Sequence, residues 1–189
     1  MKKQLSLIFS FCAIILFASC DKTETFDDQW KNANEAQFAK IAADSRYTRI
    51  NSASTAGYIM VKEIEPGDGE TPYFTDRVRV LYTGWFKTDW SEERDTYTDD
   101  RGETIINKII FDSTDNRNNI PSTFYVDPSR SNIVTDGLST ALQHMQVGDK
   151  WEIWIPWNLG FGSSGYSAYR IESYTTLVFE IELVSIVKE

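Results

Sequence analysis

FDSTDNRNNIPSTF, residues Phe111 to Phe124, brings an aromatic ring, a carboxylate and a guanidinium together within a short segment (Phe111, Asp112 and Arg117). Phe111 can form the wall of an apolar cavity, whereas Asp112 is costly to bury unless it is hydrogen bonded. Arg117 offers a planar set of donors that can hold this carboxylate. The same residues also suit a polar surface turn, because Asp, Ser and Asn favour turns. Taken alone, the segment leaves a functional site and a surface turn both open.

Further motifs accompany this segment in a definite order. They are GYIMVKEIEPGDGETP (57–72), VRVLYTGWF (78–86), GLSTALQHMQVGDK (137–150), IPWNLGFG (155–162) and TLVFEIELVSI (176–186). Together with FDSTDNR they resemble the FKBP-type peptidyl-prolyl cis-trans isomerases, whose pattern includes V-x-V-x-Y-T-G, F-D-S-S-x-x-R, I-P-P-x-L-A-Y-G and T-L-x-F-x-V-E-L. The resemblance covers about residues 55–189. The order of all the motifs is far more specific than any one of them.

The resemblance implies an α+β fold in which an antiparallel sheet curves around a short helix. It also implies a proline-binding cavity in which Tyr82, Phe111 and Asp112 carry the catalysis and Thr135 presents its backbone N–H to the substrate. No cofactor and no metal ion belong to this site. The substrate-binding residues that the resemblance implies are Arg117, Phe124, Val134, Thr135, Leu138, Phe161 and Phe179.

The chain departs from the family pattern at several site positions. Leu138 stands where the family has a tryptophan floor, and Phe161 stands where it has a tyrosine. Ser122 replaces the first aromatic residue of P-F-x-F, and residues 170–174 lack the Ile-Pro-Pro of the loop over the pocket. We therefore expect the fold to be retained and catalysis to be weaker than is usual in the family.

The first twenty residues, MKKQLSLIFSFCAIILFASC, have the pattern of an export signal: Lys2 and Lys3, then an apolar run over 5–17, then Ala18-Ser19. Cys20 follows at the position where bacterial lipoproteins carry their lipid. An uncleaved anchor is the alternative, although the run is shorter than the about 20 residues that a membrane span needs. The sequence predicts a lipoprotein signal peptide over 1–19, lipidation of Cys20, and an exported protein held in the cell envelope by this lipid anchor.

Composition excludes several classes of function. The 189 residues contain 28 acidic and 19 basic side chains, a net charge of −9, which argues against a nucleic-acid partner because phosphates need a basic surface. One histidine and two cysteines, of which Cys12 lies in the signal, leave no metal site and no nucleophile–base pair. The length suits a single domain, and we expect a monomer.

Residues 20–54 read as a tether and an N-terminal helix ahead of the domain over 55–189. Residues 21–29 are acidic and polar, and residues 30–47 are predicted to be helical because Phe38, Ile41 and Ala42 share one face. This helix can pack on its own domain or contact a partner, and packing on its own domain is the simpler hypothesis.

Alternating patterns predict strands over 58–64, 77–86, 150–156 and 176–187. Within the second strand, Val78, Val80 and Tyr82 point toward the core. The Tyr82 hydroxyl then needs a hydrogen-bond partner, and Asp112 is the partner that we predict.

A short helix is predicted over 136–145, capped by Asp136. Its apolar stripe comprises Leu138, Ala141, Leu142 and Met145.

Residues 87–108 form an insert between two family motifs and are rich in Asp and Glu. The part from 95 to 106 does not fit a calcium loop, because Gly102 is misplaced and no Glu closes it. We predict a solvated loop, or an extended hairpin that turns at 99–102, outside the core.

The leading hypothesis is a peptidyl-prolyl cis-trans isomerase that assists the folding of exported, proline-containing polypeptides. The alternative is a binding or chaperone module of the same fold that holds such segments without useful catalysis. The altered pocket and the insert favour the module, and the retained Tyr82, Phe111, Asp112 and Arg117 favour the enzyme.

Overall fold

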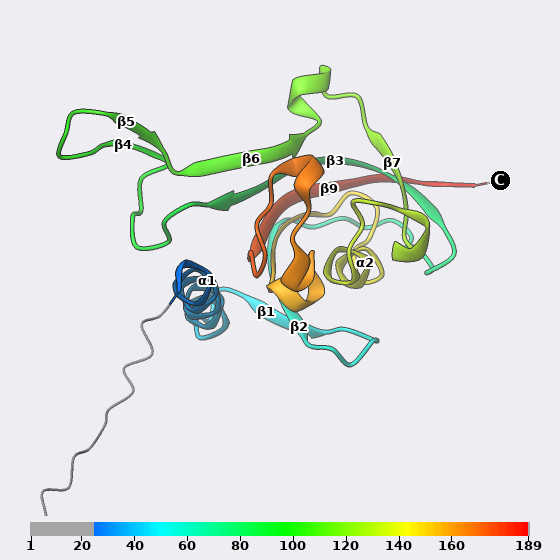
Figure 1. Cartoon of the computed structure of the whole chain (residues 1–189). Helices are drawn as coiled ribbons and strands as arrows, with labels where there is room; N and C mark the ends of the chain where they lie inside the picture. Colours follow the sequence, from blue (N-terminus) through cyan, green and yellow to red (C-terminus); the bar gives the residue numbers. More distant parts are fainter. Residues whose placement is uncertain (1–24, 189) are drawn as a thin grey trace, which may run out of the picture.

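The computed structural model describes residues 25–188, so the predicted signal peptide and Cys20 lie outside the described range. Figure 1 shows a curved sheet with a short helix, α2, lying inside its curve and a longer helix, α1, on another side. The elements are α1 (Phe26–Ala42), β1 (Thr48–Asn51), β2 (Tyr58–Glu65), β3 (Arg77–Lys87), β4 (Thr96–Thr98), β5 (Thr104–Ile106), β6 (Lys108–Ser113), η1 (Asp115–Arg117), β7 (Ser122–Tyr125), η2 (Pro128–Arg130), α2 (Asp136–Leu142), β8 (Lys150–Ile155), η3 (Trp157–Leu159), η4 (Gly162–Ser164), η5 (Ser167–Tyr169) and β9 (Leu177–Val187).

The sheet is antiparallel throughout and runs in the order β1-β2-β8-β9-β3-β6, with β7 also paired to β3. β4 and β5 form a separate two-stranded sheet. This mixed architecture, with an antiparallel sheet curved around a short helix, confirms the predicted fold class. β1 pairs with β2 and so belongs to the sheet. The sheet therefore begins before residue 55, which is the residue at which the sequence analysis placed the start of the domain.

The central strands β3 and β9 alternate as the sequence predicted. Val78, Val80 and Tyr82 of β3 are buried, and so are Phe179 and Ile181 of β9. Burial of such side chains contributes about 1.5–3 kcal/mol each relative to leaving them exposed. Because β3 lies between β9 and the strand pair β6 and β7, its inward residues line the centre of the core.

Helix α1 begins at Phe26, earlier than predicted, because Thr25 and Asp28 form a capping box. The Thr25 hydroxyl accepts from the Asp28 backbone N–H, and the Asp28 carboxylate accepts from the Thr25 backbone N–H, so two otherwise unpaired donors are satisfied. Phe38 and Ile41 pack on the sheet, and this confirms packing on the helix's own domain. No helix within residues 25–188 is long and apolar enough to cross a membrane.

Helix α2 ends at Leu142, one turn before the predicted end, and its predicted apolar stripe is fully buried. The N-cap is Thr135, whose hydroxyl accepts from the Leu138 backbone N–H; the prediction that Asp136 caps the helix was wrong. The Asp136 carboxylate instead accepts hydrogen bonds from the hydroxyls of Ser52 and Ser54. Asp136 therefore joins α2 to the segment that follows β1.

The insert is an extended hairpin of β4 and β5, as one of the two predicted alternatives had it. Thr96 pairs with Ile106 and Thr98 with Thr104, and the turn lies over 99–102. Ile106 is largely exposed, so the hairpin does not pack on the core through this residue.

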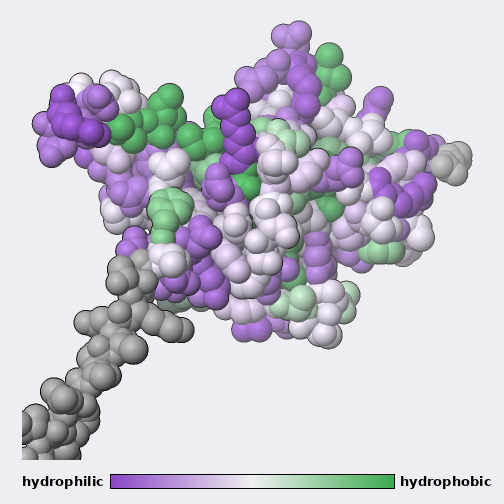
Figure 2. Space-filling model, viewed as in Figure 1, coloured by the Kyte–Doolittle hydropathy of each residue, from purple (hydrophilic) through white to green (hydrophobic). Residues whose placement is uncertain are grey.

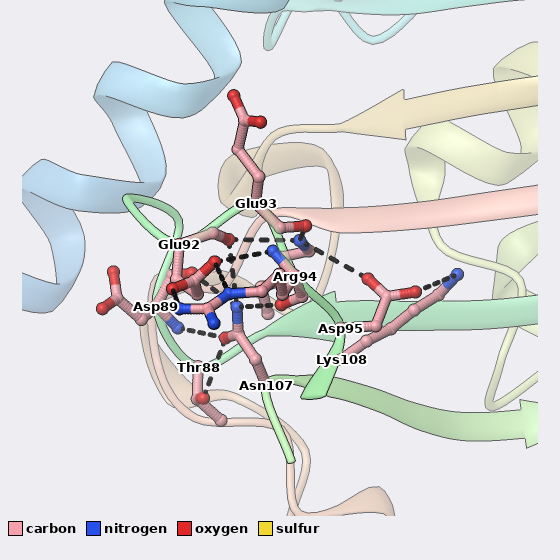
Figure 3. Close-up of polar contacts among 9 residues, drawn as sticks. Thr88, Asp89, Glu92, Glu93, Arg94, Asp95, Asn107 and Lys108 are labelled. Atoms are coloured by element: carbon pink, nitrogen blue, oxygen red, sulfur yellow. Dashed lines mark hydrogen bonds and ion pairs between the residues drawn. The ribbon is translucent and has the colours of Figure 1, made fainter. Parts of the chain in front are cut away.

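A buried asparagine closes the base of the insert (Figure 3). The Asn107 side-chain amide donates to the backbone carbonyls of Asp89, Glu92 and Arg94, at 3.0, 3.1 and 3.0 Å. Its oxygen accepts from the Asp89 backbone N–H at 2.8 Å and from the Thr88 hydroxyl at 3.1 Å. Residues 88–94 are thus wrapped around one side chain.

The insert also contacts the domain through Trp90. Its ring lies 5.5 Å from that of Trp154 and 6.2 Å from that of Trp85, measured between centroids. Its indole N–H donates to the Asn34 side-chain oxygen of α1 at 3.0 Å. The expectation of an insert wholly outside the core was therefore wrong for the 88–94 segment, because a tryptophan there reaches the sheet and α1.

Candidate active site

A glycine in β3 makes room for the aromatic wall of the site. β3 and β6 pair with an irregularity next to Gly84, opposite Asp112. A Cβ atom at Gly84 would lie 2.5 Å from Cζ of Phe111 and 2.9 Å from Cε1 of Phe179. Since such distances are too short for carbon atoms, only glycine lets these two rings close over the strand.

The Tyr82 hydroxyl has the partner that the sequence predicted. It donates to Oδ2 of Asp112 at 2.5 Å and accepts from Nη2 of Arg117 at 3.1 Å. Arg117 also forms an ion pair with Oδ1 of Asp112 at 3.3 Å. The Asp112 side chain is only 14% exposed, so this network holds a carboxylate that would otherwise be costly to bury.

The environment keeps the Tyr82 hydroxyl protonated. Burial raises its pKa well above the usual value for tyrosine, and the hydrogen bond to the Asp112 carboxylate raises it further, while Arg117 acts in the opposite direction. The hydrogen bond to Tyr82 likewise raises the pKa of Arg117. Tyr82 is therefore a hydrogen-bond donor, and Arg117 a cation, throughout the neutral range.

Aromatic rings surround this network. The Phe111 ring meets the Phe179 ring edge-on at 5.5 Å between centroids, and the Tyr82 ring lies 5.1 Å from the Phe124 ring. Phe179 and Phe124 are buried, whereas Phe111 is partly exposed at the edge of this aromatic group. The arrangement places a fixed charge beside an apolar aromatic wall.

The remaining predicted residues belong to or adjoin the hydrophobic core that also contains Tyr82, Phe124 and Phe179. Val134 and Leu138 are buried in it, and Phe161 packs against it from the loop after η3. Leu138 is completely buried. Thr135, although outside the cluster, adjoins Val134 and is the N-cap of α2. Residues that lie far apart in the sequence thus contribute to one hydrophobic core that includes both Tyr82 and Leu138.

The sequence reasoning missed Tyr169. Its hydroxyl donates to Oδ2 of Asp112 at 3.3 Å, and its ring lies 6.0 Å from that of Phe111. Tyr166 beside it stacks on Phe161 at 4.9 Å. Phe161 lacks the hydroxyl that the family has at that position, and Tyr169 brings a tyrosine hydroxyl to the rim from a different part of the loop. In the sequence, the only indication of this role was that the loop over 160–174 contains several tyrosines.

A hollow of about 1050 Å³ lies elsewhere, between the loop over 70–77, Tyr125 and the end of β9. None of the predicted site residues lines it. We take the Tyr82–Asp112 cluster as the candidate active site because a packed core has no need of a carboxylate and a guanidinium, and their presence there points to function.

Comparison with known proteins identifies the family. The family model described as FKBP-type peptidyl-prolyl cis-trans isomerase matches residues 69–184. The chain is 37% identical over 156 residues to the FKBP-type 22 kDa peptidyl-prolyl cis-trans isomerase of Escherichia coli, covering 79% of this chain and 63% of that relative. It is 32% identical over 130 residues to the Outer membrane protein MIP of Legionella longbeachae, covering 69% of this chain and 45% of the relative.

The fold is similar to that of a solved relative. The crystal structure of a peptidyl-prolyl cis-trans isomerase from Pseudomonas syringae matches with a TM-score of 0.61 and 26% identity. The match covers 88% of this chain and 99% of the Pseudomonas chain. The match to the family model spans more than half of the residues, from the loop between β2 and β3 into β9. The chain belongs to the FKBP-type peptidyl-prolyl cis-trans isomerase family.

Proposed function

We propose that this protein is a peptidyl-prolyl cis-trans isomerase that assists the folding of exported, proline-containing polypeptides. The observation that carries the proposal is the Tyr82–Asp112–Arg117 network at the rim of an aromatic cluster. It is supported by membership of the family, although the chain spans under two thirds of the length of the Escherichia coli relative.

This reaction needs no nucleophile. Rotation about an Xaa-Pro amide is slow because the bond has partial double-bond character, with a barrier of about 18–20 kcal/mol. The twisted transition state loses resonance and is less polar than the planar amide. An apolar cavity that removes the proline from water therefore favours the transition state over the ground state. The hydroxyls of Tyr82 and Tyr169 and the Asp112 carboxylate would orient the flanking carbonyl groups at the rim.

A second candidate function is binding of unfolded segments without catalysis. Figure 2 shows hydrophobic residues gathered over β5 and β6, between the hairpin and the rest of the molecule. Ile106 and Ile110 there are 63% and 53% exposed, and β6 is an edge strand among the described residues. An exposed apolar edge strand is suited to pairing with an extended chain. We call Ile106 and Ile110 the isoleucine strip.

One experiment with two substrates separates these functions. β6 also carries Phe111, and Ile106 lies five residues earlier, about 17 Å along an extended chain. A proline tetrapeptide in the site cannot reach that far, whereas an unfolded protein can. The wild-type protein is expected to accelerate cis-to-trans conversion of the tetrapeptide and proline-limited refolding of a protein.

The variant Ile106→Ser is expected to keep the tetrapeptide activity and to lose part of the refolding activity. Ile64→Ser, which alters an exposed isoleucine of β2, is the control. Suppression of aggregation with no acceleration of either substrate would replace the isomerase by the binding module.

We further propose that the protein is exported as a monomeric lipoprotein and is anchored in the cell envelope through Cys20. The proposal is supported by the apolar run followed by Ala18-Ser19-Cys20 and by a relative whose name is Outer membrane protein MIP. Expressed in its own host, Cys20→Ser is expected to release the protein from membranes or to block processing. Membrane fractionation and the mass of the mature chain measure this, and an unchanged mass and partition would contradict the anchor.

A further inference from the structure

The loop over 160–174 completes the candidate site but has a strained backbone. It carries Tyr169, whose hydroxyl reaches Asp112, and Tyr166, whose ring stacks on Phe161. Arg170 and Tyr174 both have positive φ, at 53° and 59°, which residues other than glycine rarely adopt. A loop in such a conformation needs surrounding contacts that hold it.

Helix α1 contacts the end of this loop. The Trp30 indole N–H donates to the backbone carbonyl of Ser173 at 2.9 Å. The Asn34 side-chain oxygen accepts from the Thr176 backbone N–H at 2.8 Å, and the Asn34 carbonyl accepts from the Thr176 hydroxyl at 3.2 Å. These bonds lie on either side of Tyr174, so α1 holds the strained end of the loop against the start of β9.

The Asn34 side chain is buried, and its polar atoms make three hydrogen bonds. Its amide donates to the Trp30 carbonyl at 2.9 Å, and its oxygen accepts from the Trp90 indole of the insert as well as from Thr176. Asn34 therefore links α1, the base of the insert and the loop in one network. Such a network fixes the position of each member better than a single bond would.

We propose that α1 positions the loop of the active site, with Trp30 and Asn34 as positioning residues that act through Tyr169 on Asp112. The proposal rests on the proposed isomerase function. α1 lies outside residues 69–184, the part matched by the family model, so this role belongs to the additional N-terminal part of the chain. The insert takes part because the Trp90 indole N–H donates to the same Asn34 oxygen that accepts from Thr176.

The first test uses Trp30→Phe, which keeps an aromatic ring and removes the N–H that binds Ser173. Hydrogen exchange is expected to become faster at the amides of Tyr166, Ile171 and Tyr174, whose bonds hold the loop together. Tyr47→Phe is the control, because it removes a hydroxyl bond to Glu152 away from the loop. Equal exchange in Trp30→Phe and the wild type would overturn the proposal.

The second test is a double-mutant cycle on activity. Trp30→Phe is expected to lower kcat/KM for a proline tetrapeptide by about three- to tenfold, the effect of one lost hydrogen bond. In a Tyr169→Phe background the same substitution should have much less effect, because the hydroxyl that the loop delivers is already absent. If Trp30→Phe lowered kcat/KM by the same factor in the wild-type and the Tyr169→Phe backgrounds, Trp30 would support the stability of the protein in general and would not act through Tyr169.

The outcomes for the two proposals are distinguishable. Wild-type protein without isomerase activity would refute the proposed function, whereas the hydrogen-exchange comparison would still decide whether α1 holds the loop. Asn34→Ala gives a second variant, expected to speed exchange at Thr176 and Tyr174. Normal exchange there in a folded Asn34→Ala protein would remove Asn34 from the positioning role.

Discussion

Asp112→Ala is expected to lower kcat/KM for an Xaa-Pro peptide by roughly 10- to 100-fold, the factor that corresponds to losing a charged hydrogen-bond partner. The carboxylate accepts from the hydroxyls of Tyr82 and Tyr169 and pairs with Arg117, so its removal frees three groups at the rim at once. The same loss leaves the buried Tyr82 hydroxyl without its acceptor, and stability should fall by about 1–3 kcal/mol. We expect the loss of rate to be the larger effect.

Activity and the unfolding midpoint must be measured on the same variant. Asp115→Ala is the matched control, because it makes the same charge change three residues away at an exposed position. Full activity with lowered stability in Asp112→Ala would assign this residue to the scaffold and remove it from the candidate site. Equal loss of activity in Asp115→Ala would show that general charge, and not the rim carboxylate, matters.

Asn107→Ala is expected to lower the stability of the protein by about 2–4 kcal/mol. The Asn107 side chain pairs with three backbone carbonyls, one backbone N–H and one hydroxyl, and alanine can replace none of these bonds. Chemical denaturation measures the change. Asn116→Ala, at an exposed position in η1, provides the control.

A change of under about 1 kcal/mol in Asn107→Ala would show that water replaces the lost bonds and that the base of the insert is open. The hairpin beyond this base should matter much less, since its outer residues are exposed and pair mainly with one another. We expect the protein to stay folded when the β4–β5 hairpin is shortened and to lose stability when Asn107 is replaced. The two results together would show that the base of the insert, and not its outer hairpin, supports the fold.

Much of the fold follows from local patterns in the sequence. The alternation of Val78, Val80 and Tyr82 and the stripe of α2 depend only on the repeat of a strand or helix, so they identify buried faces without knowledge of the partner. The Tyr82–Asp112 hydrogen bond could also be predicted, because a tyrosine that points into a core needs a partner. The start of α1 was missed because Phe26 and Asp28 were assigned to a polar tether, although Thr25 and Asp28 already formed a cap.

Other features depend on contacts between residues that are distant in the sequence. Asn34 bonds to Trp90 and Thr176, and Tyr169 bonds to Asp112, across separations of 56, 142 and 57 residues. No periodicity encodes such pairs, since a polar side chain in a helix or loop can as easily face water. Only when the sheet brings α1, the insert and the loop over 160–174 together does burial make each of these hydrogen bonds necessary, because an unpaired polar group there would be costly.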